Sequence, residues 1–258
     1  MTQLETLTRK QPAGGSATGP NCAVERLGRA CTALERQVFF IVGCQKSGTT
    51  WVQHLLDGHP AARCHGEGYF AAVLMPLLQQ VAGAFNQRHK AGELGGLGDE
   101  DVRALFAAAC GLHFDRWIGD AAGIEAVGEK TPEHALCLPA IDATFPDAKV
   151  VHVIRDGRDV CVSGWFHNLR MNNPQFRQRF PDFASYVAYT IGNHWVPYIQ
   201  RARQFGHAHP DRYHEVRYEQ LHAASAETVG ALLGFLGLDD GAASVEACLE
   251  AGAFERLS

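Results

Sequence analysis

The chain has 258 residues, of which 46% are hydrophobic and 20% are charged, values typical of a globular protein with a substantial core. Its formal net charge of −5 excludes a broad cationic surface for nucleic acid, so any anion must be bound by a local site. The chain begins with charged residues and no apolar run, and its longest apolar stretch, residues 69–78, is too short to cross a membrane. We therefore expect a cytoplasmic protein whose eight scattered cysteines are reduced thiols.

Two regions are predicted from composition and periodicity. Residues 1–35 are expected to be a flexible N-terminal leader and lead-in, because the first twenty residues are rich in Gly, Pro, Ser and Thr. Residues 36–258 are expected to form one α/β domain. Apolar runs predict buried strands at 38–42 and 150–154, a weaker strand at 213–216, and a fourth that ends at Val127.

Helical patterns lie between these strands, at residues 50–57, 102–112, 183–204 and 227–236. The third is interrupted near Pro197, and the last is capped by Gly237. Apolar strands that alternate with helices predict a parallel sheet covered on both faces. Ligands of such sheets bind at the carboxyl ends of the strands.

The first motif, residues 43–50, lies between a predicted strand and a predicted helix. Gly43 and Gly48 have the spacing of a P-loop, whose backbone amides and helix N-terminus bind phosphate. The lysine is displaced to Lys46, and Thr49 stands where a nucleoside triphosphatase has its lysine. We therefore expect Lys46 to lie beside the first phosphate; the alternative is a plain strand–turn–helix with a surface lysine.

The second motif follows the strand at 150–154 and opens a helix. Arg155 stands at the strand end, and Ser163 lies about two helical turns further on. A guanidinium and a hydroxyl in these places can bind a second phosphate, whereas Arg158 is expected to pair locally with Asp156 or Asp159. The two motifs together predict a nucleotide with two separated phosphate groups.

In these motifs the chain resembles the sulfotransferase family, whose donor is 3′-phosphoadenosine 5′-phosphosulfate (PAPS). Residues 46–51 resemble its 5′-phosphosulfate loop, residues 153–160 with Ser163 its 3′-phosphate motif, and residues 217–221 its Tyr-Glu-Asp-Leu segment. The resemblance runs from about residue 38 to the C-terminus and is to bacterial and carbohydrate-type members. It implies the P-loop-like sulfotransferase fold. It also implies sulfuryl transfer, without a metal, to a hydroxyl or amine of a small-molecule or carbohydrate acceptor, with adenosine 3′,5′-bisphosphate (PAP) as product.

The resemblance also implies roles for individual residues. Lys46 would contact the 5′-phosphate and stabilise the leaving nucleotide, and Lys130 would neutralise the sulfuryl oxygens unless it is a solvated lysine at a strand end. The donor would be held at its 5′-phosphate by Ser47, Gly48, Thr49 and Thr50, at its 3′-phosphate by Arg155 and Ser163, and at its adenine by Trp51 and Tyr218. Core packing is the alternative role for both aromatic residues.

The acceptor hydroxyl requires a general base. Cytosolic members of the family use a histidine, whose place here is taken by Pro132. Members that resemble heparan-type enzymes use a glutamate shortly after the first helix, and Glu67 is the candidate for that base here. The alternative is that Glu67 is an ordinary exposed glutamate of a turn. His65 is the runner-up, and His134 is a further candidate that we expect at the polar surface.

Two other functions are weighed against sulfuryl transfer. A P-loop kinase or nucleoside triphosphatase needs a lysine after Gly48 and an acidic Mg²⁺ ligand at a strand end, and these places hold Thr49 and Arg155. A non-catalytic nucleotide-binding protein has its best support in the C-terminus, whereas the presence of Lys46, Lys130 and Glu67 argues against it, because binding alone needs no second lysine and no base. Residues 251–258 resemble only the start of the family's C-terminal region, so the basic loop that closes over the 3′-phosphate is expected to be missing.

The acceptor pocket is expected between residues 69–97 and 166–183. The second segment carries Arg170, Arg177 and Arg179, which suit an acidic or carbohydrate acceptor or else form a solvated basic lid.

Overall fold

The computed structural model describes residues 20–88, 95–172 and 174–253. The expected leader, up to residue 19, and the last five residues of the C-terminal segment lie outside this part of the chain. No helix among the described residues is both long enough and apolar enough to cross a membrane.

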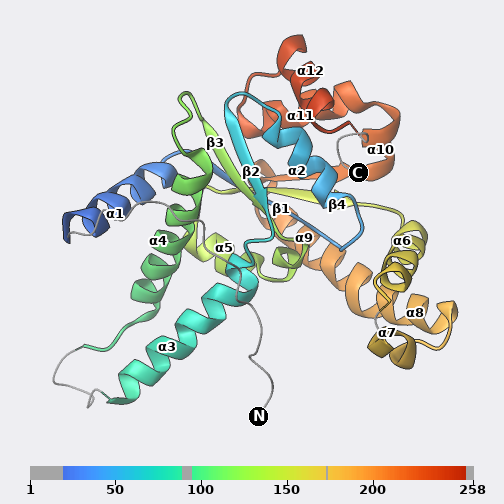
Figure 1. Cartoon of the computed structure of the whole chain (residues 1–258), viewed down its shortest axis with the longest axis horizontal. Helices are drawn as coiled ribbons and strands as arrows, with labels where there is room; N and C mark the ends of the chain where they lie inside the picture. The colour runs from blue at the N-terminus through green and yellow to red at the C-terminus, as the bar shows by residue number, and fades with distance from the viewer. Residues whose placement is uncertain (1–19, 89–94, 173, 254–258) are drawn as a thin grey trace.

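Five parallel strands form one sheet in the order β2-β3-β1-β4-β5 (Figure 1). The strands are β1 (Gln37–Gly43), β2 (Ala62–Gly66), β3 (Ala126–Lys130), β4 (Lys149–Ile154) and β5 (Tyr213–Arg217). The predicted parallel α/β sheet is therefore confirmed, as are the strands expected at 38–42, 150–154 and 213–216.

The strand prediction was wrong at two places. β3 does not end at Val127 but continues to Lys130, and the whole strand is buried between β1 and β2. Gly128 is needed there because a Cβ atom would lie 2.1 Å from the Phe39 ring. β2 was not predicted, because this edge strand is short and includes the polar residues Arg63 and His65.

Helices cover both faces of the sheet, and β1 shows how the core divides between them. Phe39 and Ile41 pack with one cluster, Phe40 and Val42 with the other, because successive side chains of a strand point to opposite faces. One face is covered by α2 (Thr49–Asp57), α11 (Ser225–Leu236) and α12 (Ala242–Ala251). The other is covered by α4 (Asp99–Ile118), α5 (Leu138–Thr144) and α9 (Val196–Ala208) (Figure 1).

The remaining elements flank these layers. The further helices are α1 (Pro20–Leu34), α3 (Met75–Arg88), α6 (Gly157–Arg170), α7 (Pro174–Arg179), α8 (Phe183–Thr190) and α10 (Tyr218–Ala223). The short helical turns are η1 (Phe70–Leu74), η2 (Pro132–Leu136), η3 (Ile191–Trp195) and η4 (Pro210–Arg212).

The helical patterns at 50–57, 102–112 and 227–236 are confirmed within α2, α4 and α11, and Gly237 caps α11 with φ 79°. The pattern at 183–204 divides into α8 and α9, joined by the π-helical turn η3. Pro197 has no amide hydrogen and its ring would clash with the carbonyl four residues earlier, so a regular helix cannot pass this point.

Residues 20–34, which we expected to belong to the lead-in, form helix α1 and pack against α4. The contact uses small side chains: Ala30 and Ala33 are buried, and a Cβ atom on Gly111 would lie 2.6 Å from the Ala30 carbonyl oxygen. Because alanine and glycine give a weak hydrophobic pattern, periodicity did not predict this helix.

Candidate active site

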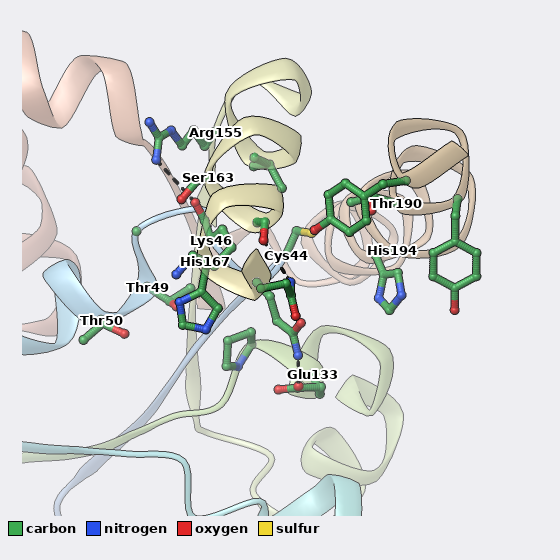
Figure 2. A pocket seen from close by; sticks show the side chains of 18 of the residues that line it. Cys44, Lys46, Thr49, Thr50, Glu133, Arg155, Ser163, His167, Thr190 and His194 are labelled. Carbon is green, nitrogen blue, oxygen red and sulfur yellow. Dashed lines mark hydrogen bonds between the residues drawn. The ribbon is translucent and has the colours of Figure 1, made fainter. Parts of the chain in front are cut away.

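The predicted motifs meet at the carboxyl edge of the sheet, where a cavity of about 1000 Å³ opens (Figure 2). Loops after β1, β2, β3 and β4 contribute to its walls, together with one face of α6 and residues of α7 and α8. The predicted donor residues that line it are Lys46, Gly48, Thr49, Thr50, Trp51, Arg155, Ser163 and Tyr218, and the candidate base Glu67 lines it as well.

The loop after β1 turns tightly and packs closely against Tyr218. Gly48 has φ 96°, and a Cβ atom there would lie 2.6 Å from the Tyr218 ring. Lys46 also has a left-handed backbone, with φ 71°, which turns the chain sharply before α2. No side chain caps the N-terminus of α2, so the amides of its first turn and the helix dipole favour an anionic ligand.

Basic side chains gather at this end of the cavity. Burial lowers the pKa of Lys46, and the nearby charges of Arg170 and Arg155 lower it further. The Arg155 guanidinium lies 4.2 Å from the centre of the Tyr218 ring, and its Nη1 donates weakly to the Lys46 carbonyl oxygen at 3.5 Å. Among the described residues, no ion pair involves Lys46, Arg155 or Arg170. An anion bound here would therefore relieve repulsion between like charges.

Three predicted donor residues differ from their expected arrangement. The Ser47 side chain is 1% exposed and does not line the cavity, and its Oγ has no hydrogen-bond partner within the described part of the chain. Trp51 and Tyr218 contact each other edge to face with ring centres 5.5 Å apart, so an adenine between them would have to separate them. Trp51 also donates from Nε1 to the Gly252 carbonyl oxygen at 2.9 Å, which ties it to the core.

The segment that carries Glu67 is held by the end of β3. Both Glu67 and Tyr69 have left-handed backbones, with φ 56° and 50°, so this short loop requires external support. Four backbone amides of this segment donate hydrogen bonds to acceptors in β3 and just after it. The pairs are Glu67 to the Lys130 carbonyl (2.6 Å), Gly68 to Glu129 Oε1 (2.6 Å), Tyr69 to Thr131 Oγ1 (3.2 Å) and Ala71 to His134 Nε2 (3.1 Å).

Both oxygens of the Glu67 carboxylate have a hydrogen-bond donor. Lys130 Nζ lies 2.8 Å from Oε1, and the Tyr69 hydroxyl donates to Oε2 at 2.9 Å. The hydrogen bonds from Lys130 and Tyr69 outweigh the effect of burial and lower the pKa of Glu67. The hydrogen bond between Tyr69 and Glu67 in turn raises the pKa of Tyr69 to about 12. The Glu67 carboxylate is therefore ionised at neutral pH and lies in the cavity wall.

Lys130 is neither solvated nor in the cavity wall. Its side chain is 4% exposed and lies behind Glu67, so in this arrangement it meets the carboxylate and not the cavity.

The two alternative bases are not in the cavity wall. His134, which we expected at the polar surface, is completely buried, with Nδ1 2.9 Å from Glu129 Oε2. Because its Nε2 accepts from the Ala71 amide, the proton of the neutral ring must be on Nδ1. His65 stacks on Trp117 with ring centres 5.0 Å apart. Neither imidazole is placed to reach an acceptor in the cavity.

Sequence reasoning missed several cavity residues. Glu133 accepts a hydrogen bond from Gln45 Nε2, and His167 lies one helical turn beyond Ser163. An aromatic wall is formed by Phe176, Phe180, Tyr186 and Tyr189. The spacing of Ser163 and His167 on α6 is a signal that identifies His167. The aromatic wall combines a ring of α7, a ring of the connection after it and two rings of α8, and no local pattern in the sequence identifies it as a unit.

The expected acceptor segments contribute unequally. From residues 166–183, His167, Asn168, Gln175, Phe176, Arg179 and Phe180 line the cavity, whereas Tyr69 is the only lining residue among those described between residues 69 and 97. Arg179 stacks on Tyr189 at 4.2 Å. Arg158 pairs with Asp156 at 2.6 Å and is 90% exposed, as expected for a local ion pair.

Comparison with known proteins adds to this geometry. A family model described as "Sulfotransferase family" matches residues 38–241. A Caenorhabditis briggsae protein named "Putative protein-tyrosine sulfotransferase" is 32% identical over 129 residues, which cover 49% of this chain and 42% of that protein. The chain spans between 27% and 42% of the length of the curated relatives it matches.

Solved structures share the fold. A sulfotransferase from Alicyclobacillus acidocaldarius has a TM-score of 0.53 and 21% identity, over 78% of this chain and 81% of that one. Mouse sulfotransferase SULT7A1 complexed with PAP has a TM-score of 0.53 and 16% identity, over 90% of this chain and 70% of that one. At these identities the similarity concerns the fold alone.

We predict that His134→Ala destabilises the fold. The substitution leaves the Ala71 amide without its acceptor and the buried Glu129 carboxylate without its neighbour, which should cost about 3 kcal/mol or more in the free energy of unfolding. Urea denaturation would measure the loss. His207→Ala, at an exposed position on α9, is the matched control and should change stability by less than about 0.5 kcal/mol. Equal stabilities of the two variants would contradict a supporting role for His134.

Proposed function

We propose, since the chain belongs to the sulfotransferase family, that it transfers a sulfuryl group from PAPS to a hydroxyl or amine of a small-molecule or carbohydrate acceptor. One observation carries this proposal. A cluster of basic side chains without acidic partners among the described residues shares a cavity with the ionised carboxylate of Glu67. The presence of PAP in a mouse enzyme of the same fold supports the choice of nucleotide.

The residues of the loop and of the second motif fit the two phosphates of such a donor. Lys46 and the uncapped N-terminus of α2 offer positive charge to the 5′ end. Arg155 offers a guanidinium whose Nε is buried without a partner among the described residues, and Ser163 offers a hydroxyl from the same side. When bound, the donor supplies the electrophilic sulfur and the nucleotide leaving group.

The chain's own groups then have separate tasks in an in-line displacement. Glu67 accepts a proton from the hydroxyl or amine of the acceptor molecule, while the oxygen or nitrogen of that group attacks the sulfur. Lys46 stabilises the negative charge that develops on the departing phosphate. Lys130 keeps Glu67 ionised through the 2.8 Å contact; it reaches the sulfuryl oxygens only if that pair separates.

The acceptor half of the cavity is aromatic, with a single arginine, Arg179, stacked on one of its rings. This wall suits an acceptor with an apolar or sugar-ring face, because aromatic side chains bind both through extended flat contact. The identity of the acceptor within this class is left to direct screening.

The kinase alternative finds no support in the arrangement. Thr49 occupies the lysine position of that class, and the acidic residue at the end of β3, Glu129, is buried and engaged by Gly68 and His134. A non-catalytic role leaves the ionised Glu67 on the cavity wall unexplained.

We predict that PAP binds without metal and that Arg155→Ala weakens it. Loss of a charge-assisted contact to phosphate should cost about 1.5–3 kcal/mol, roughly a 10-fold to 100-fold increase in Kd. Isothermal titration calorimetry with PAP and with Mg²⁺–ATP measures both. Arg158→Ala is the matched control, because Arg158 is exposed and paired with Asp156. Tight binding of Mg²⁺–ATP with no binding of PAP would refute the proposed donor.

We predict that Glu67→Gln lowers turnover by about 10²–10⁴-fold and leaves PAP affinity nearly unchanged, since the amide keeps the shape and loses the basicity. Release of PAP, measured with an acceptor found by screening, reports turnover. Glu133→Gln removes the other cavity carboxylate and serves as the control. Full turnover by Glu67→Gln, or the predicted loss in Glu133→Gln instead, would reassign the base.

We predict that Tyr69→Phe moves the acid limb of the kcat/KM profile to higher pH. Glu67 has a lowered pKa, so its basic form is present above its ordinary pKa and is lost as the pH falls through the lowered value. Removing the Tyr69 hydroxyl removes one of the hydrogen bonds that lower this pKa, so the loss begins at higher pH. Tyr189→Phe, elsewhere in the same cavity, should leave the limb in place. Identical profiles for wild type and Tyr69→Phe would contradict this role.

A further inference from the structure

Helix α6 presents one face to the cavity, and His167 is on it. Val160, Ser163, Gly164 and His167 lie at helical spacing, and all line the cavity. Figure 2 shows the His167 ring beside Lys46, on the wall that also carries Ser163. The His167 side chain is exposed. Within the described part of the chain, its ring makes no hydrogen bond.

The surroundings of His167 are basic. Lys46, from the loop after β1, has the largest effect on the imidazole and lowers its pKa, with smaller contributions from burial and from Arg170 on α6 itself. The cavity carboxylates are engaged elsewhere: Glu67 by Lys130 and Tyr69, and Glu133 by Gln45. Lys46 therefore disfavours the protonated form of the His167 ring without ligand, and an oxyanion that offsets the lysine charge favours that form.

We propose that His167 is a further donor-binding residue, which as an imidazolium binds an oxyanion at the 5′ end of the nucleotide beside Lys46 and so couples donor binding to uptake of one proton. The inference rests on the proposed donor and adds a residue that neither phosphate motif includes. The proton comes from solvent and adds to the unprotonated ring nitrogen of His167, and no bond of the nucleotide is broken.

The sign of the pH dependence follows from the two states. An anion raises the pKa of His167 above its value in the unliganded protein, so its contribution to binding is present at acid pH and is lost as the pH rises through the higher value. The phosphates of PAP titrate in the same range, with a pKa of about 6. Only the ratio of affinities between wild type and a variant without the imidazole therefore isolates His167.

The test is PAP binding by isothermal titration calorimetry to wild type and His167→Gln, at about pH 5.5 and about pH 8. We expect the variant to bind about 10-fold or more weakly at the lower pH and nearly equally at the higher pH. Buffers of different ionisation enthalpy should show that wild type takes up more protons than the variant on binding. Because His167 is exposed, its replacement leaves the core intact.

His194→Gln is the matched control. His194 lines the same cavity but packs against Tyr189, with ring centres 5.3 Å apart, so its loss should not change the affinity for PAP at either pH. Adenosine 5′-monophosphate should retain the dependence on His167, and adenosine 3′-monophosphate should lack it. The opposite result would overturn the assignment to the 5′ end.

The outcomes separate the two proposals. A ratio that does not change with pH, or an equal effect in His194→Gln, overturns the role of His167 and leaves the sulfotransferase proposal standing. Absence of PAP binding at both values of pH overturns both proposals.

Discussion

The active-site arrangement depends on a buried polar group at the end of β3. Glu129, Thr131 and His134 are completely buried, and together with the Lys130 carbonyl they accept hydrogen bonds from the loop that carries Glu67. Buried polar groups must be paired, so the loop has little freedom to move away without leaving several of them unsatisfied. This network offsets the two left-handed residues of the loop and keeps the candidate base in the cavity wall.

The cavity separates charge along its length. Lys46 and Arg155 line one end, and the charges of Arg155 and Arg170 disfavour the protonated form of Lys46. A bound anion would offset this repulsion between like charges. The Glu67 carboxylate avoids the basic end because Lys130 and Tyr69 hold it at the wall.

Prediction from the sequence succeeded for elements whose structure depends on residues close together in the chain. The glycine loop, the strands at its side and the helix after it are continuous segments, so periodicity and spacing were sufficient for β1, β4 and α2. It failed for α1 and β2, whose contacts use small or polar side chains. His134 was wrongly expected at the surface because its partners, Glu129 and the Ala71 amide, come from other elements.

The sequence by itself determined the strand, glycine loop and helix around residues 43–50, the position of Arg155 and Ser163 after the strand β4, and the family resemblance. These depend on backbone conformation and on neighbours within a few residues. Only the tertiary structure decided that Lys130 lies behind Glu67, that Trp51 and Tyr218 touch each other, and that His167 faces Lys46. Such contacts depend on how the strand ends and helices pack around the sheet, and their chemistry arises from side chains far apart in the chain.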